Sequence, residues 1–319
     1  MRVLVTGANG FLGDALVAEL SRQSNEVVVA VRLPHSNVRA NKSAFVVGDI
    51  SANTDWRQAV AGVDAIVHLA ARVHVMRETA DDPMAEFRRV NTDGTLNLAR
   101  QAAAAGVRRF VFVSSVGVNG KATESGTAFT EADVPSPYDA YTLSKYEAEV
   151  GLRALAQTTR MEMVIVRPTL VYGRGAPGNF RRLTRLVAKD RLLPLASITN
   201  RRSLLGIDNF VNFISICMKH SAAANETFLV SDGEDLSTPD LIRRLSIAMN
   251  RKERLVGVPV PLLWAAAAML GKRDEAQRIC GSLQVDISKA RTLLRWHPPV
   301  SVDEGLRRSI ANGHAETLR

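Results

Sequence analysis

Val3-Leu-Val-Thr-Gly-Ala-Asn-Gly-Phe-Leu-Gly13 is the stretch that decides the fold of this chain. It joins a short apolar strand to a helix through a turn with the spacing G-x-x-G-x-x-G. Gly7 permits the tight turn, Gly10 lets a ligand approach the backbone, and Gly13 lets helix and strand pack closely. The N-terminal end of the following helix favours a phosphate or pyrophosphate. This strand, turn and helix open a βαβ unit and therefore predict a dinucleotide site.

Strands alternate with helices through the first half of the chain. The strands are predicted over residues 2–6, 27–31, 44–47, 65–69 and 109–113, and a long helix is predicted over 83–105. This alternation predicts an α/β fold, a Rossmann doubly wound parallel sheet. After Pro168 the alternation breaks down, and the remaining chain is helix-rich. We predict a dinucleotide-binding domain over 1–172, with later segments such as 203–220 returning to it, and a second, helix-rich part over 173–319.

The end of the second strand bears on which nicotinamide cofactor is bound. An NAD-binding unit carries an acidic residue there, which accepts hydrogen bonds from the adenosine ribose. This strand ends instead in Arg32, whose planar guanidinium can pair with a 2′-phosphate. NADP(H) is therefore favoured and NAD stays an alternative. Asp49, after the third strand, stands where a carboxylate can accept from the adenine amino group, and Ala70 and Ala71 allow close approach of the pyrophosphate and ribose.

An acid–base pair is predicted at the start of a later helix. Tyr141 and Lys145 are four residues apart and share one helix face. A nearby ammonium lowers the pKa of a phenol, which would make Tyr141 an acid–base group near neutral pH. Ser115, at the end of the strand predicted over 109–113, can hydrogen-bond the same substrate oxygen.

Motifs in a common order and spacing give the chain its resemblance to a known family. They are Thr6-Gly-Ala-Asn-Gly-Phe-Leu-Gly13, Asp49-Ile50, His68-Leu-Ala-Ala71, Asn91-x-x-Gly-Thr95, Ser114-Ser115, Tyr141-x-x-x-Lys145 and Arg167-Pro168. The chain resembles the extended short-chain dehydrogenases/reductases, in the branch that acts on nucleotide sugars. The resemblance implies that Ser115, Tyr141 and Lys145 are catalytic, that Lys145 also holds the nicotinamide ribose, and that Asn91 supports the site.

The resemblance also supplies expectations for the ligands and for assembly. The predicted cofactor site comprises Gly7, Asn9, Gly10, Phe11, Leu12, Gly13, Arg32, Asp49, Ile50, Leu69, Ala70, Ala71, Asn91, Tyr141, Lys145 and Pro168. Asn179 and Arg201 match positions that usually contact uridine diphosphate, so a UDP-sugar substrate is expected, with Ser115 beside the sugar. The resemblance also implies that the helix-rich part over 173–319 is a smaller C-terminal substrate lid, and therefore a mainly substrate-binding domain. A homodimer through the helices near 83–105 and 141–158 is implied as well.

Three reactions compete in this family: 4,6-dehydration, 4-epimerisation and reduction of a 4-keto sugar. Dehydratases carry Asp-Glu directly after the catalytic serine or threonine. This chain has Val116-Gly117 there, and neither side chain can carry a proton, so dehydration is not expected. The chain looks most similar to NADPH-using reductases of UDP-linked 4-keto-6-deoxy-N-acetylhexosamines, which serve surface polysaccharide synthesis. A UDP-glucose or UDP-N-acetylglucosamine 4-epimerase with tightly bound NAD is the alternative. A non-enzymatic NADP(H) sensor is remote, because such proteins typically lose the tyrosine or the lysine.

Composition excludes several other classes of function. The 319 residues carry a net charge of +9 without a long basic run with interleaved aromatic residues, so no nucleic-acid partner is predicted. Two cysteines in apolar surroundings argue for a reducing compartment, and a cytoplasmic protein is expected. The six histidines are scattered, which predicts no metal site. The longest apolar run, Val258 to Leu270, is too short to span a bilayer, so no stable membrane insertion is predicted. The run from Val258 to Leu270 is predicted to be a buried helix in preference to one that contacts a membrane surface.

Overall fold

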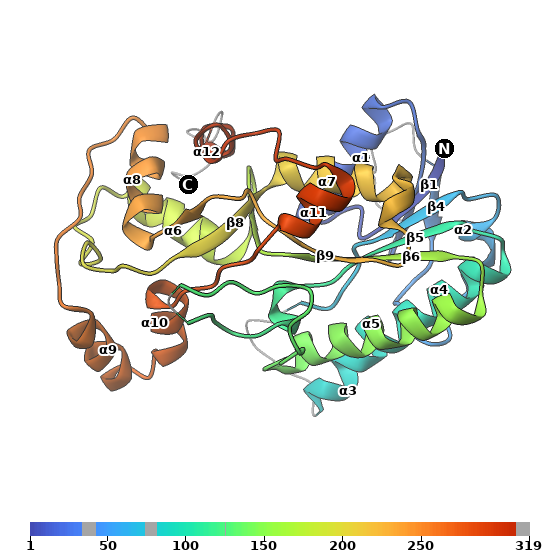
Figure 1. The fold of residues 1–319 in the computed structure, drawn as a ribbon, viewed down its shortest axis with the longest axis horizontal. Coiled ribbons are helices and arrows are strands. Elements are labelled where there is room, and N and C mark those ends of the chain that lie inside the picture. Colours follow the sequence, from blue (N-terminus) through green and yellow to red (C-terminus); the bar gives the residue numbers. More distant parts are fainter. Residues whose placement is uncertain (34–42, 74–81, 125, 311–319) are drawn as a thin grey trace.

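A seven-stranded, wholly parallel sheet forms the centre of the molecule (Figure 1). The computed structural model describes residues 1–33, 43–73, 82–124 and 126–310. Across the sheet the strands are β3 (Ser43–Val46), β2 (Glu26–Val31), β1 (Arg2–Thr6), β4 (Ala65–His68), β5 (Arg109–Val113), β6 (Glu162–Pro168) and β9 (Thr227–Val230). The order reverses direction between β1 and β4, which is the topological switch point of a doubly wound fold. The predicted Rossmann sheet is confirmed.

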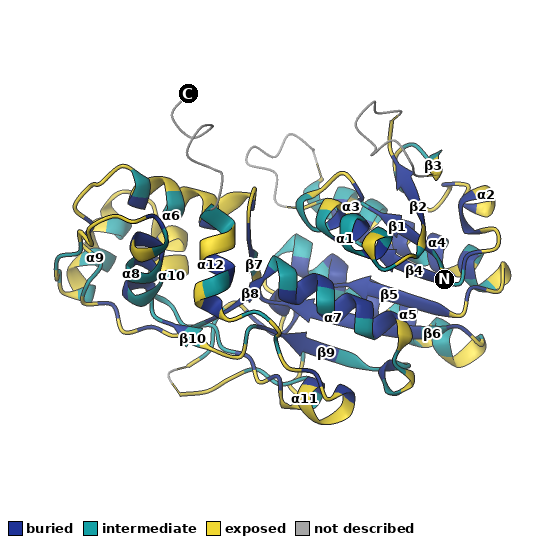
Figure 2. Ribbon diagram, turned by 90° about the horizontal axis from the view of Figure 1, so that it is seen from above, coloured by how far each residue is buried: buried dark blue, intermediate teal, exposed yellow. Residues whose placement is uncertain are grey.

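Helices cover both faces of the sheet because alternate strand residues point to opposite sides. Val3 and Val5 belong to one core cluster, and Leu4 belongs to the other. The first face packs α1 (Phe11–Arg22), α7 (Ile207–Lys219) and α11 (Ser288–Leu294). The second face packs α2 (Arg57–Val60), α4 (Gly94–Ala104) and α5 (Ala140–Thr158), and α3 (Pro83–Phe87) lies against α5. The parallel strands are therefore buried on both sides, as Figure 2 shows for β4, β5 and β6.

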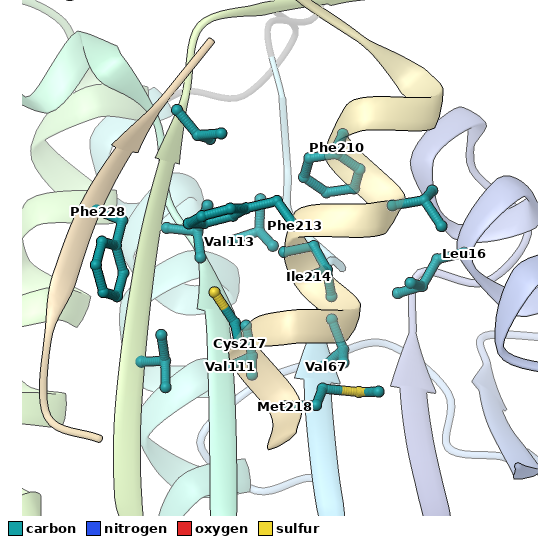
Figure 3. Packing of buried hydrophobic residues seen from close by; sticks show 14 of the residues in the cluster. Leu16, Val67, Val111, Val113, Phe210, Phe213, Ile214, Cys217, Met218 and Phe228 are labelled. Carbon is teal, nitrogen blue, oxygen red and sulfur yellow. The ribbon is translucent and has the colours of Figure 1, made fainter. Parts of the chain in front are cut away.

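Aromatic packing joins α7 to the sheet on the first face (Figure 3). The rings of Phe213 and Phe228 meet edge-on with centroids 5.7 Å apart, and those of Phe213 and Trp296 meet at 4.8 Å. The indole N–H of Trp296 donates to Asn212 Oδ1 at 2.9 Å. Trp296 is therefore a core residue with its one polar group satisfied.

The helix predicted over 83–105 is interrupted. After α3, residues Arg88–Asp93 form a π-helical turn, and α4 begins at Gly94. The turn buries Asn91 and Thr92 against α5, where the Thr92 hydroxyl donates to the Ser144 carbonyl at 2.9 Å. Wider helical turns of this kind often occur at functional sites.

A second, smaller unit lies beyond the carboxyl ends of the strands. Within residues 126–310, which the structure describes, it contains a three-stranded sheet and five helices: β7 (Leu170–Tyr172), β8 (Arg202–Gly206), β10 (Asp235–Leu236), α6 (Gly178–Ala188), α8 (Thr238–Ala248), α9 (Val260–Met269), α10 (Arg273–Cys280) and α12 (Val302–Ile310). Its own apolar cluster is formed by residues such as Tyr172, Phe180 and Leu306. The division of the chain at residue 172 stays a prediction.

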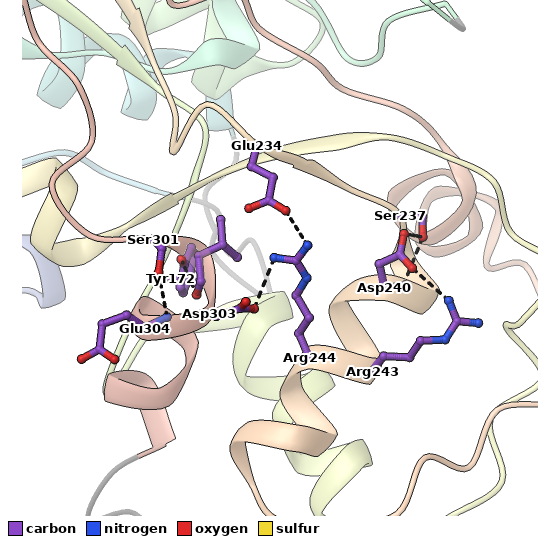
Figure 4. A network of polar contacts seen from close by, with 10 residues as sticks. Tyr172, Glu234, Ser237, Asp240, Arg243, Arg244, Ser301, Asp303 and Glu304 are labelled. Atoms are coloured by element: carbon purple, nitrogen blue, oxygen red, sulfur yellow. Dashed lines mark hydrogen bonds and ion pairs between the residues drawn. The ribbon is translucent and has the colours of Figure 1, made fainter.

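Polar contacts tie the segments of this unit together (Figure 4). Arg244 on α8 contacts Glu234 and, at 3.2 Å, Asp303 on α12. The Tyr172 hydroxyl donates to Asp232 Oδ2 at 2.8 Å. Segments that are distant in sequence are thereby joined around one small core.

The prediction of a buried helix over Val258 to Leu270 is wrong. This run forms α9 and its flanks, and none of the helix residues is buried. All sides of this run are apolar, but the smaller unit has too little apolar surface against which the helix could pack. In the part of the chain that the structure describes, no helix is both long and apolar enough to cross a bilayer.

Candidate active site

A cleft of about 950 Å³ lies at the carboxyl ends of the central strands, where the smaller unit meets the sheet. Ligands of doubly wound folds bind at this edge, beside the switch point. Most of the predicted site residues line the cleft: Gly7, Asn9, Gly10, Phe11, Leu12, Gly13, Arg32, Asp49, Ile50, Leu69, Ala70, Ala71, Ser115, Tyr141, Lys145 and Pro168.

The glycine turn has the geometry that close packing requires. Gly7 has φ +69°, and a Cβ added there would lie 2.8 Å from the Ala70 backbone nitrogen. A Cβ at Gly13 would lie 2.1 Å from the Gly7 carbonyl oxygen, so only glycine fits. Gly10 caps α1 without a side-chain hydrogen bond, and the first backbone N–H groups of the helix are left for an anion. The turn therefore fits a dinucleotide pyrophosphate.

Arg32 and Asp49 form an exposed pair at the adenosine end of the cleft. Arg32 Nη1 lies 3.8 Å from Asp49 Oδ1, and about seven-tenths of each side chain is exposed. An exposed ion pair of this kind contributes little stability. Both side chains are thus available to a ligand.

Ser115, Tyr141 and Lys145 come together from two elements. Ser115 follows β5, and its Oγ accepts a hydrogen bond from the Gly117 N–H at 3.1 Å. Tyr141 is the second residue of α5, whose start is fixed by a capping box between Asp139 and Thr142. Lys145 is buried one turn later, with its Nζ 4.2 Å from the centre of the Phe112 ring. The rigid start of α5 thus aims a phenol and an ammonium into the cleft beside a hydroxyl.

Known proteins share this arrangement of sheet and cleft. Residues 3–231 match the NAD dependent epimerase/dehydratase family. The chain belongs to that family. It is 45% identical over 309 residues to a UDP-glucose 4-epimerase of Vibrio cholerae, covering 96% of this chain and 94% of the relative. The family resemblance seen in the sequence is confirmed, and the chain is an NAD(P)-dependent enzyme.

Solved structures share the fold over nearly the whole chain. A Thermotoga maritima UDP-glucose 4-epimerase with UDP-glucose superposes with a TM-score of 0.77 at 23% identity, covering 97% of each chain. A Bacillus cereus UDP-glucuronic acid 4-epimerase in complex with NAD gives 0.76 at 23% identity, again covering 97% of each chain. The small unit beyond the sheet is therefore part of the shared architecture.

Burial sets the proton affinities of the two residues on α5. It raises the pKa of Tyr141 to about 12, with smaller contributions from Asp139 and Tyr138. Burial lowers the pKa of Lys145 to about 7, and Glu149 partly opposes that shift. The predicted lowering of the Tyr141 pKa by Lys145 is not seen, because the cost of desolvating a phenolate is larger. Tyr141 is therefore set up as a proton donor in this structure.

Because Lys145 is buried, the stability of the fold should depend on pH. In the unfolded chain Lys145 titrates near its ordinary pKa of about 10.4. Between about pH 7 and 10 the unfolded state therefore binds more protons than the folded state. The free energy of unfolding should therefore rise with pH over this range. One pKa unit corresponds to about 1.4 kcal/mol, and the Lys145 contribution should exceed that value.

Urea unfolding at about pH 7 and about pH 9 measures this effect. The Lys145→Met variant should lose the rise, whereas Lys219→Met, which removes an exposed ammonium at the end of α7, should keep it. Equal pH dependence in all three proteins would show that Lys145 is solvated in solution.

His68 is a structural residue in this family member. Its Nδ1 lies 2.7 Å from Thr6 Oγ1 and its Nε2 lies 3.0 Å from Thr95 Oγ1. Burial, with the nearby Lys145 charge, lowers its pKa to about 3, so the ring is neutral. Thr6 Oγ1 also accepts from the Leu69 and Ala70 N–H groups. The ring therefore helps to fix the backbone that forms the cleft wall.

Asn91 occupies a supporting position. It is buried, does not line the cleft, and exchanges hydrogen bonds with the Arg72 backbone: its Oδ1 accepts at 2.8 Å and its Nδ2 donates at 3.0 Å. Its Nδ2 also donates to Ser144 Oγ at 3.0 Å. Asn91 thus ties the segment after β4 to α5, and a direct cofactor contact stays a prediction.

The predicted uridine diphosphate contacts lie outside the cleft. Asn179 and Arg201 are exposed, and neither lines it. Arg202, which the sequence analysis missed, does line it, and burial lowers its pKa. Successive residues of a strand face opposite sides, and Arg202 begins β8, so strand alternation was the signal that separates the two arginines.

Tyr138 was also missed. It lines the cleft three residues before Tyr141.

Among the residues that the structure describes, no group of three His, Cys, Asp or Glu side chains is placed to hold a metal ion.

Proposed function

We propose that this enzyme is a UDP-sugar 4-epimerase, which inverts the configuration at C4 of the hexose. The observation that carries the proposal is the presence of Ser115, Tyr141 and Lys145 in one cleft with the glycine turn. The 45% identity to a UDP-glucose 4-epimerase over nearly the whole chain supports the same reaction. UDP-glucose is the first substrate to test.

The chain's own residues supply proton transfer and positioning. A nicotinamide ring, when bound, takes up and returns the C4 hydride. In the oxidising half of the cycle Tyr141 would act as the phenolate and take the proton from the C4 hydroxyl, and in the reducing half the resulting phenol would give that proton back to the C4 oxygen. Ser115 donates a hydrogen bond to the C4 oxygen in both halves. With its pKa lowered to about 7, Lys145 is charged in only part of the molecules at neutral pH; in that form its ammonium would favour the phenolate, although burial of the Tyr141 phenol outweighs this effect in the structure.

The substrate's diphosphate requires a positively charged wall. Arg202 lines the cleft on the smaller unit, and its Nη1 also donates to the Gly281 carbonyl at 3.0 Å. That hydrogen bond fixes the guanidinium in the wall, where it can bind a phosphate. We propose Arg202 as a diphosphate contact; a role for Asn179 and Arg201 stays the prediction drawn from the family resemblance, since neither side chain lines the cleft.

Reduction of a UDP-linked 4-keto-6-deoxy-N-acetylhexosamine is the second candidate, and Arg32 favours it. A reductase consumes cofactor at every turnover, and an arginine at the end of β2 suits the 2′-phosphate of NADPH. The same residues would act in one direction only, with Tyr141 giving its proton to the C4 oxygen. Surface polysaccharide synthesis, a cytoplasmic location and a homodimer through α4 and α5 accompany either candidate as proposals.

One experiment separates the two candidates. The purified protein is denatured and any released nicotinamide is identified, and intact protein is incubated with UDP-glucose without added cofactor. We expect stoichiometric NAD and formation of UDP-galactose. An empty site, a preference for NADPH and no epimerisation of UDP-glucose would favour the reductase, and a protein inactive on both substrate classes would overturn the proposal.

A further inference from the structure

Helix α9 shows apolar side chains on the face that points to solvent. The helix has the sequence Val-Pro-Leu-Leu-Trp-Ala-Ala-Ala-Ala-Met over residues 260–269 and carries no charged residue. Leu262 is 60% exposed and Met269 83% exposed, and Ala265 and Ala266 between them are exposed as well. The spacing i, i+3, i+4, i+7 places these four residues on one face. A helix on the surface of a globular protein normally carries its polar residues there.

Neither common explanation of an apolar helix applies to α9. A buried core helix would have buried residues, and α9 has none (Figure 2). A membrane span needs about 20 apolar residues, and α9 has 10. An apolar run of about 10–14 residues that is neither buried in the core nor long enough to span a bilayer fits an interfacial segment.

Basic side chains border the helix on both sides in the sequence. Arg251, Lys252 and Arg254 precede it, and Lys272 and Arg273 follow it, all of them exposed. Residues 251–278 contain six basic and three acidic residues. Ion pairs involve both signs: Glu253 pairs with Arg243, Asp274 with Lys121, and Arg254 with Asp190 at 2.7 Å. The sequence that flanks α9 still carries an excess of basic over acidic residues, and Lys272 and Arg273 follow the helix directly.

We propose that α9 binds the surface of an anionic lipid bilayer. The apolar face formed by Leu262, Ala265, Ala266 and Met269 would enter the interfacial region, and the basic border would meet the lipid phosphates. Trp264, half-buried on the other side of the helix, suits the headgroup level. The binding is peripheral, since α9 is too short to span the bilayer.

A second copy of the chain fits this face less well. A symmetric dimer would place the same patch against itself and bring the two basic borders together, which is repulsive. A bilayer with anionic lipids offers instead a charge of the opposite sign and an extended apolar phase.

The position of α9 allows the enzyme to work while bound. Helices α9 and α10 lie at the end of the molecule opposite β1 and the N-terminus (Figure 1). The chain leaves α10 towards Leu283, which lines the cleft and whose N–H donates to the Arg201 carbonyl at 2.9 Å. The bilayer contact would thus lie on the substrate side of the molecule, away from the glycine turn.

Binding to vesicles tests the proposal in the intact enzyme. The chain is sedimented with vesicles of phosphatidylglycerol and phosphatidylethanolamine, and with vesicles of phosphatidylcholine as the neutral comparison. We expect binding to the anionic vesicles that weakens as salt is added. A Leu262→Glu/Met269→Glu variant should bind at least about tenfold more weakly. In a Lys272→Gln/Arg273→Gln variant, the affinity for anionic vesicles should fall about fivefold for each charge removed.

Two controls make the test specific. Ile247→Glu changes a 77% exposed apolar residue on α8 and should bind as well as the unchanged protein. Of the three tryptophans, Trp56 and Trp296 are buried, so a blue shift of fluorescence on adding vesicles should come from Trp264 and be absent in Trp264→Phe. Vesicle binding that is absent, or unchanged by the α9 substitutions, overturns the proposal. A change of oligomeric state in Leu262→Glu/Met269→Glu without any vesicle binding would assign the face to a second copy.

Discussion

Replacing Tyr141 with phenylalanine should lower kcat by about a hundredfold to ten-thousandfold, the range typical for loss of a general acid–base group. The substitution removes one oxygen and keeps the ring, which packs edge-on against Phe87 with centroids 6.3 Å apart. The shape of the cleft should therefore be preserved. Steady-state kinetics on UDP-glucose, together with titration of the nicotinamide cofactor, would show a lost rate with cofactor affinity nearly unchanged.

Tyr138→Phe is the matched control for this prediction. Tyr138 lines the same cleft, but it is 48% exposed and precedes the helix that carries Lys145. We expect its loss to reduce kcat by less than about tenfold, because it is not placed to transfer a proton with Lys145. If Tyr141→Phe kept full turnover, or if Tyr138→Phe were the more damaging change, the proton donor would have to be reassigned.

Replacing Arg167 with methionine should destabilise the fold by about 3 kcal/mol, the lower end of the cost of breaking a buried ion pair, because Glu149 keeps one further partner, the partly exposed Arg153 at 2.9 Å. Arg167 is 2% exposed, and its guanidinium donates to both carboxylate oxygens of Glu149, at 2.9 and 2.6 Å. Glu149 is fully buried one turn after Lys145, and it also accepts from the Ser114 hydroxyl at 2.6 Å. Ser114 precedes Ser115, so this ion pair holds β5, β6 and α5 together directly behind the site.

Urea unfolding measures this cost, and the neighbouring pair Arg88–Glu147 supplies the control. Arg88 also donates through two nitrogens to a carboxylate on α5, but its side chain is 48% exposed. Arg88→Met should cost less than about 1 kcal/mol. The double variant Glu149→Leu/Arg167→Met should recover part of the loss, because no unpaired charge is left buried. Equal costs for Arg88→Met and Arg167→Met would contradict the role given to burial.

Most of the fold was predictable because it depends on patterns of residues that are close together in the sequence. The spacing of Gly7, Gly10 and Gly13 predicts a strand, a turn and a helix, and the structure shows that a Cβ at Gly13 would collide with the Gly7 carbonyl. The apolar strands at regular intervals predicted a parallel sheet, since each needs a helix on either face. Tyr141 and Lys145 were predictable as a pair because a fixed spacing of four places them on one helix face.

The misses come from contacts that no local pattern contains. The run around α9 resembles a core helix in composition, yet whether it is buried depends on how much surface the smaller unit offers it. Strand alternation predicts that Arg201 and Arg202 face opposite sides, but only the structure shows that Arg202 is the one that lines the cleft. The pKa of Tyr141 follows from the burial of the phenol, which the sequence spacing to Lys145 does not report.

By itself, the sequence determined the family, the Rossmann sheet, the glycine turn and the identity of the acid–base pair, because each depends on residue types at fixed short spacings. Only the tertiary structure decided the other features. It gathered Ser115, Tyr141 and Lys145 into one cleft, placed Glu149 and Arg167 behind them as a buried ion pair, and left the apolar face of α9 exposed. The physical reason is that burial and charge pairing depend on the distance between atoms in space, and parts of the chain that are remote in sequence set that distance.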